Sequence, residues 1–179
     1  MNESSEGAKR FYGKYKGTVT LNADPEFRGR IICLVPAVLG PTPSGWCEPC
    51  APLAGPTGPP MGVYMVPPPG TGVWVEFEGG DPEKPIWSGC RFAPGNVPPL
   101  ALANPPDPNI CIQSLLQNMI MVSDMPPSPV TGGIILKSTL GAMIVVNDTG
   151  IYISNGKGAT ITMVGPAIDF NVGALTILK

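Results

Sequence analysis

The chain has 179 residues, 13% of them charged, with a formal net charge of −2 and no histidine. Because histidine is the commonest general base and metal ligand, its absence counts against most hydrolytic and metal-dependent chemistries. So few charged residues, about half the usual share, indicate a surface that is largely buried in an assembly, and the lack of an extended basic cluster argues against nucleic-acid binding.

Residues 1–15 are predicted to form an N-terminal arm. The chain begins with polar and acidic residues, which does not fit a secretory signal, so we expect synthesis in the cytoplasm. Phe11, Tyr12 and Tyr15 lie among basic residues in this arm. They belong either to a frayed terminus or to a strap that docks on a neighbouring protein, since exposed aromatic side chains often serve as anchors.

Residues 16–93 are predicted to form a small β-barrel. Apolar and polar residues alternate at 17–21, 29–35, 72–78 and 86–90, and another short strand is expected at 46–50. Such alternation indicates half-buried strands, and turns rich in proline and glycine separate them. About five short antiparallel strands in so short a stretch suggest a closed barrel, of which the OB-fold is the common case.

Residues 94–109 are predicted to form a neck. Six of these residues are proline, at positions 94, 98, 99, 105, 106 and 108. That density predicts a stiff, extended linker without helix.

Residues 110–179 are predicted to be a series of short strands. Alternating triplets occur at 144–146, 151–153, 161–163, 168–170 and 175–177, with glycines at the corners between them. Residues 111–124 also resemble residues 135–148, at a constant offset of 24 residues. A repeat of that length favours a β-solenoid or β-prism over two similar hairpins in an ordinary β domain.

These strands have one apolar face, and no helix follows that could cover it. We therefore expect three copies to associate around an axis, with backbone groups paired across chains. The predicted trimer core consists of Ile120, Val122, Ile144, Val146, Ile151, Ile153, Ile161, Met163, Ile168 and Phe170.

The cysteines allow three interpretations. Cys47 and Cys50 form a CxxC pair, which together with Cys33 and Cys90 could make a four-thiolate zinc site. The alternatives are one disulfide, such as Cys50–Cys90, or buried unreactive thiols. The last is favoured, because alternation along a strand sends Cys47 and Cys50 to opposite faces. Cys111 stands apart from the other four.

Carboxylates and tryptophans supply the rival functions. An enzyme would use Glu76 or Asp81, but these are expected to be solvated or paired with Lys84 or Arg91. A module that binds a saccharide or single-stranded nucleic acid would use Trp46, Trp74 and Trp87 as stacking platforms, although their alternation suits core positions. The remaining acidic candidates, Asp124, Asp148 and Asp169, are expected to accept turn N–H groups, with cation binding along the trimer axis as the alternative.

Several stretches carry a family resemblance. Residues 24–31, 46–50 and above all 73–82, which read Val-Trp-Val-Glu-Phe-Glu-Gly-Gly-Asp-Pro, resemble the baseplate-spike OB domain of contractile phage tails and of the valine-glycine-repeat spikes of type VI secretion. Residues 165–177 are similar to the closing turns of the trimeric β-helix in the same family. The two resemblances occur in the family's own order.

This resemblance implies an all-β homotrimer with an OB-fold barrel followed by an intertwined trimeric β-helix, or β-prism. It implies a structural, non-enzymatic, membrane-piercing spike without cofactor, which docks on a baseplate hub protein through Phe11, Tyr12 and Tyr15. Related spikes hold iron at the apex through a His-x-His pattern that this chain lacks. The implied apex is therefore blunt and would carry a small tip-capping (PAAR-like) protein on Leu175, Ile177, Leu178 and Lys179. The expected location is the virion tail baseplate or an equivalent injection particle that meets a cell envelope.

Overall fold

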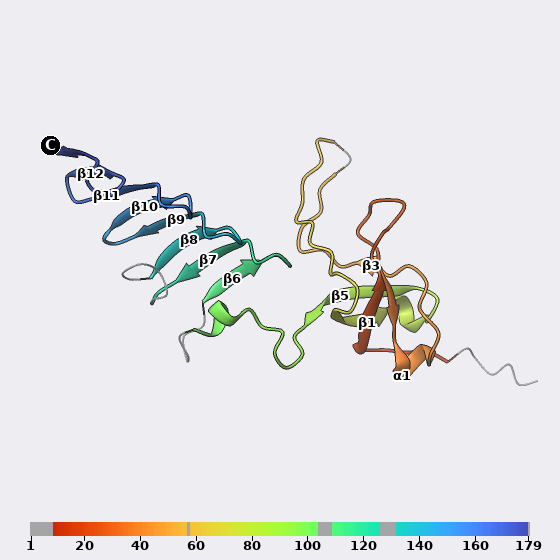
Figure 1. The fold of residues 1–179 in the computed structure, drawn as a ribbon. Coiled ribbons are helices and arrows are strands. Elements are labelled where there is room, and N and C mark those ends of the chain that lie inside the picture. The colour runs from red at the N-terminus through yellow and green to blue at the C-terminus, as the bar shows by residue number, and fades with distance from the viewer. Residues whose placement is uncertain (1–8, 57, 104–108, 126–131, 179) are drawn as a thin grey trace, which may run out of the picture. The chain divides into compact units, whose positions relative to one another are not determined.

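The computed structural model describes residues 9–56, 58–103, 109–125 and 132–178. The chain divides into two compact units, Met1–Gly95 and Asn96–Lys179 (Figure 1). Each unit contains one β-sheet and only short helical turns, which confirms the all-β prediction. No helix among the described residues is long and apolar enough to cross a membrane.

The first unit is a curled five-stranded sheet with the order β2-β1-β4-β5-β3. Its strands are β1 (Tyr15–Leu21), β2 (Ile32–Leu34), β3 (Glu48–Pro49), β4 (Gly72–Phe77) and β5 (Pro85–Arg91). Neighbouring strands are antiparallel except β3 and β5, which run parallel. A bridge between Ile31 and Cys47 joins the two outer ends of the sheet, so the sheet closes on itself as a barrel.

The barrel core follows from alternation along the strands. Val73, Val75 and Phe77 of β4 point inward and are buried. The other buried members of the core are Val19, Ile31, Cys33, Val35, Cys47 and Trp87. The expectation that all three tryptophans occupy core positions is therefore correct only for Trp87, because Trp74 lies between two inward valines and is left half-buried on the outside.

Short helical segments lie in the barrel's connections and in the neck. Helix α1 (Pro36–Leu39) follows β2, and the 3-10 turn η1 (Glu78–Gly80) joins β4 to β5. A second 3-10 turn, η2 (Pro99–Leu102), lies within the predicted neck, so the expectation of a neck without helix is wrong. Leu100 of this turn packs on the C-terminal sheet. This apolar contact holds the turn in place, and it could not be predicted from the proline content of the segment.

The second unit is an antiparallel meander in which each strand pairs with the next along the chain (Figure 1). Its strands are β6 (Ile110–Gln113), β7 (Met119–Ser123), β8 (Gly133–Lys137), β9 (Met143–Asn147), β10 (Gly150–Ser154), β11 (Thr160–Val164), β12 (Ala167–Phe170) and β13 (Leu175–Leu178). The predicted triplets all fall inside strands β9 to β13.

Backbone pairing in this sheet is satisfied within one chain. The expectation that backbone groups pair across chains is therefore wrong for these strands. The physical reason is the length of the connections: a turn such as Asp148-Thr149 between β9 and β10 is short enough to close an antiparallel hairpin locally. A neighbouring chain is needed to cover side chains, not to complete the hydrogen-bond ladder.

Candidate trimer interface

One face of the C-terminal sheet is apolar at every strand position. The register fixes this face, because directly paired residues of neighbouring strands share a side of the sheet. Ile112 pairs with Ile120, Ile120 with Leu136, and Leu136 with Ile144. The apolar face, defined in this way, consists of Ile110, Ile112, Ile120, Val122, Ile134, Leu136, Ile144, Val146, Ile151, Ile153, Ile161, Met163, Ile168, Phe170, Leu175 and Ile177.

All the residues predicted for the trimer core lie on this face. The sequence reasoning missed Ile110 and Ile112 of β6, Ile134 and Leu136 of β8, and Leu175 of β13 as members of the same surface. Alternation in Ile110-Cys111-Ile112 was a usable signal, whereas Ile134-Ile135-Leu136 hides the period because both faces are apolar there. Register from the structure resolves that ambiguity.

The apolar face is uncovered within the chain. Ile134 retains 51% of its accessible surface and Ile144 retains 40%, while Met121 and Val145 on the opposite face retain none. Contiguous exposed apolar surface of this extent marks an interaction site. Completing the burial of each aliphatic side chain contributes about 1 kcal/mol, roughly 40–50% of the full-burial value of ~1.5–3 kcal/mol.

The opposite face differs along the sheet. Near β7, β8 and β9 it is apolar and is partly covered by the chain's own Leu100. Asn109 fastens this cover, since its side-chain amide donates to the Leu100 carbonyl at 2.7 Å. Further along, the same face carries Thr162 and Asp169, which suit contact with water. Only one face therefore requires a partner over its full length.

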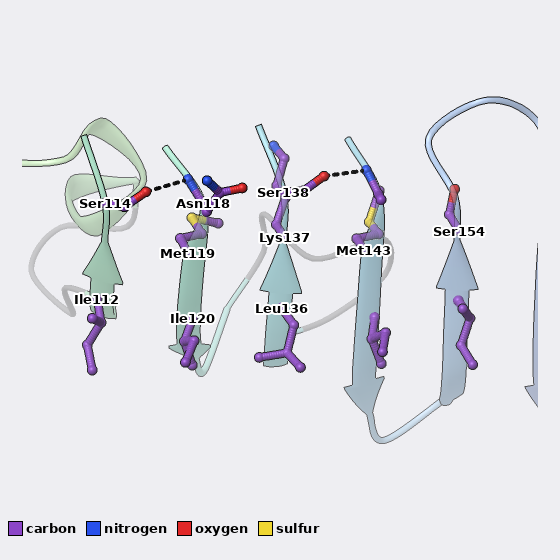
Figure 2. A pocket seen from close by; sticks show the side chains of 13 residues that line it. Ile112, Ser114, Asn118, Met119, Ile120, Leu136, Lys137, Ser138, Met143 and Ser154 are labelled. Carbon is purple, nitrogen blue, oxygen red and sulfur yellow. Dashed lines mark hydrogen bonds between the residues drawn. The ribbon is translucent and has the colours of Figure 1, made fainter. Parts of the chain in front are cut away.

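The 24-residue repeat produces two equivalent turns at one edge of the sheet. In the β6–β7 turn, the Ser114 hydroxyl accepts the backbone N–H of Asn118 at 3.2 Å. In the β8–β9 turn, the Ser138 hydroxyl accepts the N–H of Ala142 at 3.0 Å. Figure 2 shows both bonds beside a shallow groove of about 550 Å³ on the sheet. The repeat therefore encodes turn geometry as well as strand patterning.

The aromatic residues of the arm lie mainly on the barrel. Phe11 and Tyr15 pack against Phe77, with ring centroids 6.2 Å and 5.7 Å from it. The Phe11 N–H also donates to the Gly80 carbonyl at 2.9 Å. Tyr12 is 72% exposed and is the one ring of the three that is presented outward. A hub contact through these residues stays a prediction, with Tyr12 the available anchor.

The predicted tip contacts are only partly described. Leu175 and Ile177 lie on the apolar face at the last strand, and both are exposed. The backbone of Leu178 pairs with Ala167, but its side chain is outside the described set, as is Lys179 altogether. The apolar surface therefore continues to the end of the described chain, as the blunt-apex interpretation requires.

The cysteines separate as alternation predicts, with Cys47 buried and Cys50 exposed. Cys33 is buried beside Cys47, and a hydrogen bond between the two thiols, together with burial, raises the pKa of Cys33. All five thiols are free, so the Cys50–Cys90 disulfide is not formed. The expectation that the thiols are buried is wrong for Cys50 and Cys90, which are both exposed. The described residues hold no group of three or more side chains suited to a metal ion.

The acidic candidates have structural partners. Glu76 pairs with Lys14 at 3.1 Å and Asp81 with Arg10 at 3.8 Å, so the expected partners Lys84 and Arg91 were the wrong ones. The hydrogen bond from Lys14 lowers the pKa of Glu76, the opposite of what a general acid requires. Both cations, Arg10 and Lys14, belong to the N-terminal arm, and sequence spacing does not show that the arm lies beside these carboxylates.

Turn acceptors follow the prediction at one site. The Asp169 carboxylate accepts the N–H of Gly173 at 2.9 Å. Between β9 and β10, however, the neighbouring Asn147 accepts the N–H groups of Thr149 and Gly150 in place of Asp148. Asparagine and aspartate compete for this role because both side chains can bond the backbone two residues on.

Comparison with known proteins matches both units. Residues 15–92 match the type VI secretion system/phage-baseplate injector OB domain, and residues 109–176 match the phage baseplate V C-terminal trimerisation domain. No curated protein sequence matched the chain. Both families are structural parts of a baseplate rather than enzymes, and the second supports a homotrimer that is built into a virion or injection particle. The chain belongs to the baseplate spike proteins of phage tails and type VI secretion-like systems.

Proposed function

We propose that three copies of this chain form a membrane-piercing spike at the centre of a contractile injection baseplate. One observation carries the proposal: the sheet from β6 to β13 completes its own hydrogen-bond ladder yet leaves a wholly apolar face uncovered. Three such faces turned toward one axis bury one another. The match to a trimerisation domain supports this arrangement.

The proposed mechanism is mechanical and needs no turnover. Apolar layers stacked along the axis, each contributed by three chains, make a rod whose unfolding would expose every layer to water. Sheath contraction would drive this rod through a cell envelope. The polar outer side around Thr162 and Asp169 supports the proposal, since the outside of a spike must be stable in water before it strikes.

The N-terminal part is proposed to dock on the baseplate hub. Tyr12 supports this, being a large exposed aromatic on a segment that the Phe11 and Tyr15 rings fix to the barrel. A rigidly held aromatic loses little freedom on binding, which suits an anchor. Tyr12→Ala should weaken binding of the purified spike to its hub. Unchanged binding would exclude this anchor.

The apex is proposed to carry a small tip-capping protein. Leu175 and Ile177 leave an apolar layer at the last described strand, together with an open strand edge. Such an edge invites pairing with another protein unless it is covered. Removing residues 175–179 should abolish binding of the particle's cap while the trimer persists in light scattering. Retained cap binding would place the cap elsewhere.

The decisive experiment is the mass of the purified chain in solution. Size-exclusion chromatography with light scattering should give three times the 18.7 kDa chain mass. A monodisperse monomer at micromolar concentration would overturn the spike assignment. Particles assembled with a trimer-deficient variant should then contract without delivering their contents.

A further inference from the structure

A ridge of stacked turns at one edge of the C-terminal sheet presents leucines to solvent. Leu116 is 72% exposed and Leu140 is 80% exposed, each in the middle of its turn. Exposed turn tips normally carry polar residues, because nothing covers them. In the third turn of this edge, 155–159, the equivalent middle position is Lys157, which is what a solvated tip predicts.

The ridge is held in place by hydrogen bonds between turns. The Thr139 N–H donates to the Asn118 side-chain carbonyl at 3.1 Å, and the Thr139 hydroxyl donates to the Leu116 carbonyl. The third turn fits directly against the second, since a Cβ at Gly156 would lie 2.7 Å from the Leu140 carbonyl oxygen. The two leucines are therefore held on a fixed scaffold, which lowers the entropic cost of binding.

Cyclic symmetry determines what this ridge can meet. When three copies of a sheet close a ring with the same face inward, each junction is head to tail. One edge of a chain then abuts the opposite edge of the next chain. The ridge, at the edge where β6, β8 and β10 end, must face the edge where β7, β9 and β11 end. That opposite edge carries Asp124, the Asp148-Thr149 turn and Gly165-Pro166.

The opposite edge offers an apolar row. Val122, Ile134 and Val146 belong to the row of the apolar face nearest to it, and all three are substantially exposed. We infer that Leu116 and Leu140 of one chain pack against Val122, Ile134 and Val146 of the neighbouring copy and so seal the corner of the trimer. This inference rests on the proposed trimer. It adds a seam that is interrupted at Lys157, beyond which the next turn of this edge again presents an exposed apolar side chain, Val172.

Cysteine cross-linking tests the seam directly. In a background with Cys50, Cys90 and Cys111 changed to serine, Leu140→Cys is combined in turn with Asp124→Cys, Thr149→Cys or Pro166→Cys. Strands of five residues separate the two edges of one chain by roughly 16 Å. A disulfide needs Cα atoms within about 7 Å, so only a neighbouring chain can complete the bond. Diamide oxidation should yield a covalent trimer with at least one pair, and Leu140→Cys alone should yield none.

A second variant measures the contribution of the seam. Leu116→Lys with Leu140→Lys installs the residue that the third turn already carries, so the turns should fold. The trimer should melt at least several degrees lower, with an unchanged β-sheet circular dichroism spectrum at low temperature. Two results would overturn the seam while the spike proposal stands. One is a wild-type trimer with no covalent cross-link for any of the three cysteine pairs. The other is a lysine variant that melts at the wild-type temperature. A monomeric wild type overturns both the seam and the spike proposal.

Discussion

A charge placed on the apolar face should abolish the trimer. Ile144 lies on β9 and retains 40% of its accessible surface in the single chain. Ile144→Ala removes about 1 kcal/mol of burial per chain, or about 3 kcal/mol per trimer. Ile144→Asp adds three carboxylates to one apolar layer, and each unpaired buried ion costs several kcal/mol. The summed penalty, on the order of 10 kcal/mol or more, lowers the association constant by about seven powers of ten.

Light scattering over a dilution series measures this effect. Val164→Asp is the matched control, because Val164 is 44% exposed but lies on the opposite face. Ile144→Asp should be monomeric at concentrations where Val164→Asp and wild type are trimeric, with Ile144→Ala intermediate. Equal trimer content for the two aspartate variants would refute the reasoning that this face is buried between chains.

Three further predictions concern stability and thiol chemistry. Asp24 accepts hydrogen bonds from the Arg30 guanidinium at 2.7 Å and from nearby backbone N–H groups, and Arg30 in particular holds the pKa of Asp24 well below its usual range. The stability contributed by ionised Asp24 is therefore present above about pH 4, the pKa of an unfolded aspartate, and is lost as the pH falls below that value. Asp24→Asn should reduce the pH dependence of the melting temperature between about pH 2 and 5. An unchanged pH profile would contradict this. Gly156 has a φ of 70° and no space for a Cβ, so Gly156→Ala should lower the free energy of unfolding by roughly 2 kcal/mol or more. The control is Gly165→Ala, which should cost about 1 kcal/mol because Gly165 has a φ of 54° but open space around it. Equal melting temperatures for the two variants would count against the stacked turns. A chromogenic disulfide reagent should modify the exposed Cys50 and Cys90 in the folded protein but Cys33 and Cys47 only after unfolding, and fast reaction of all four would show that the barrel is not closed as described.

The sequence alone was sufficient for part of the local structure of this protein. Alternation placed the strands from β9 to β13, and the stretch from Val73 to Pro82 indicated the OB-type barrel. Period-two patterning is a property of neighbouring residues, so it survives without any knowledge of the fold. For the same reason the separation of Cys47 from Cys50 followed from their spacing.

Only the tertiary structure decided which segments meet. Leu100 covers the outer face of the sheet, Lys14 and Arg10 pair with Glu76 and Asp81, and short turns close the backbone ladder within one chain. Contacts between residues far apart in sequence depend on register and packing, which local pattern does not encode. The sheet register in particular gathers Ile112, Ile120, Leu136 and Ile144 into one continuous exposed surface, and that surface is what requires a partner.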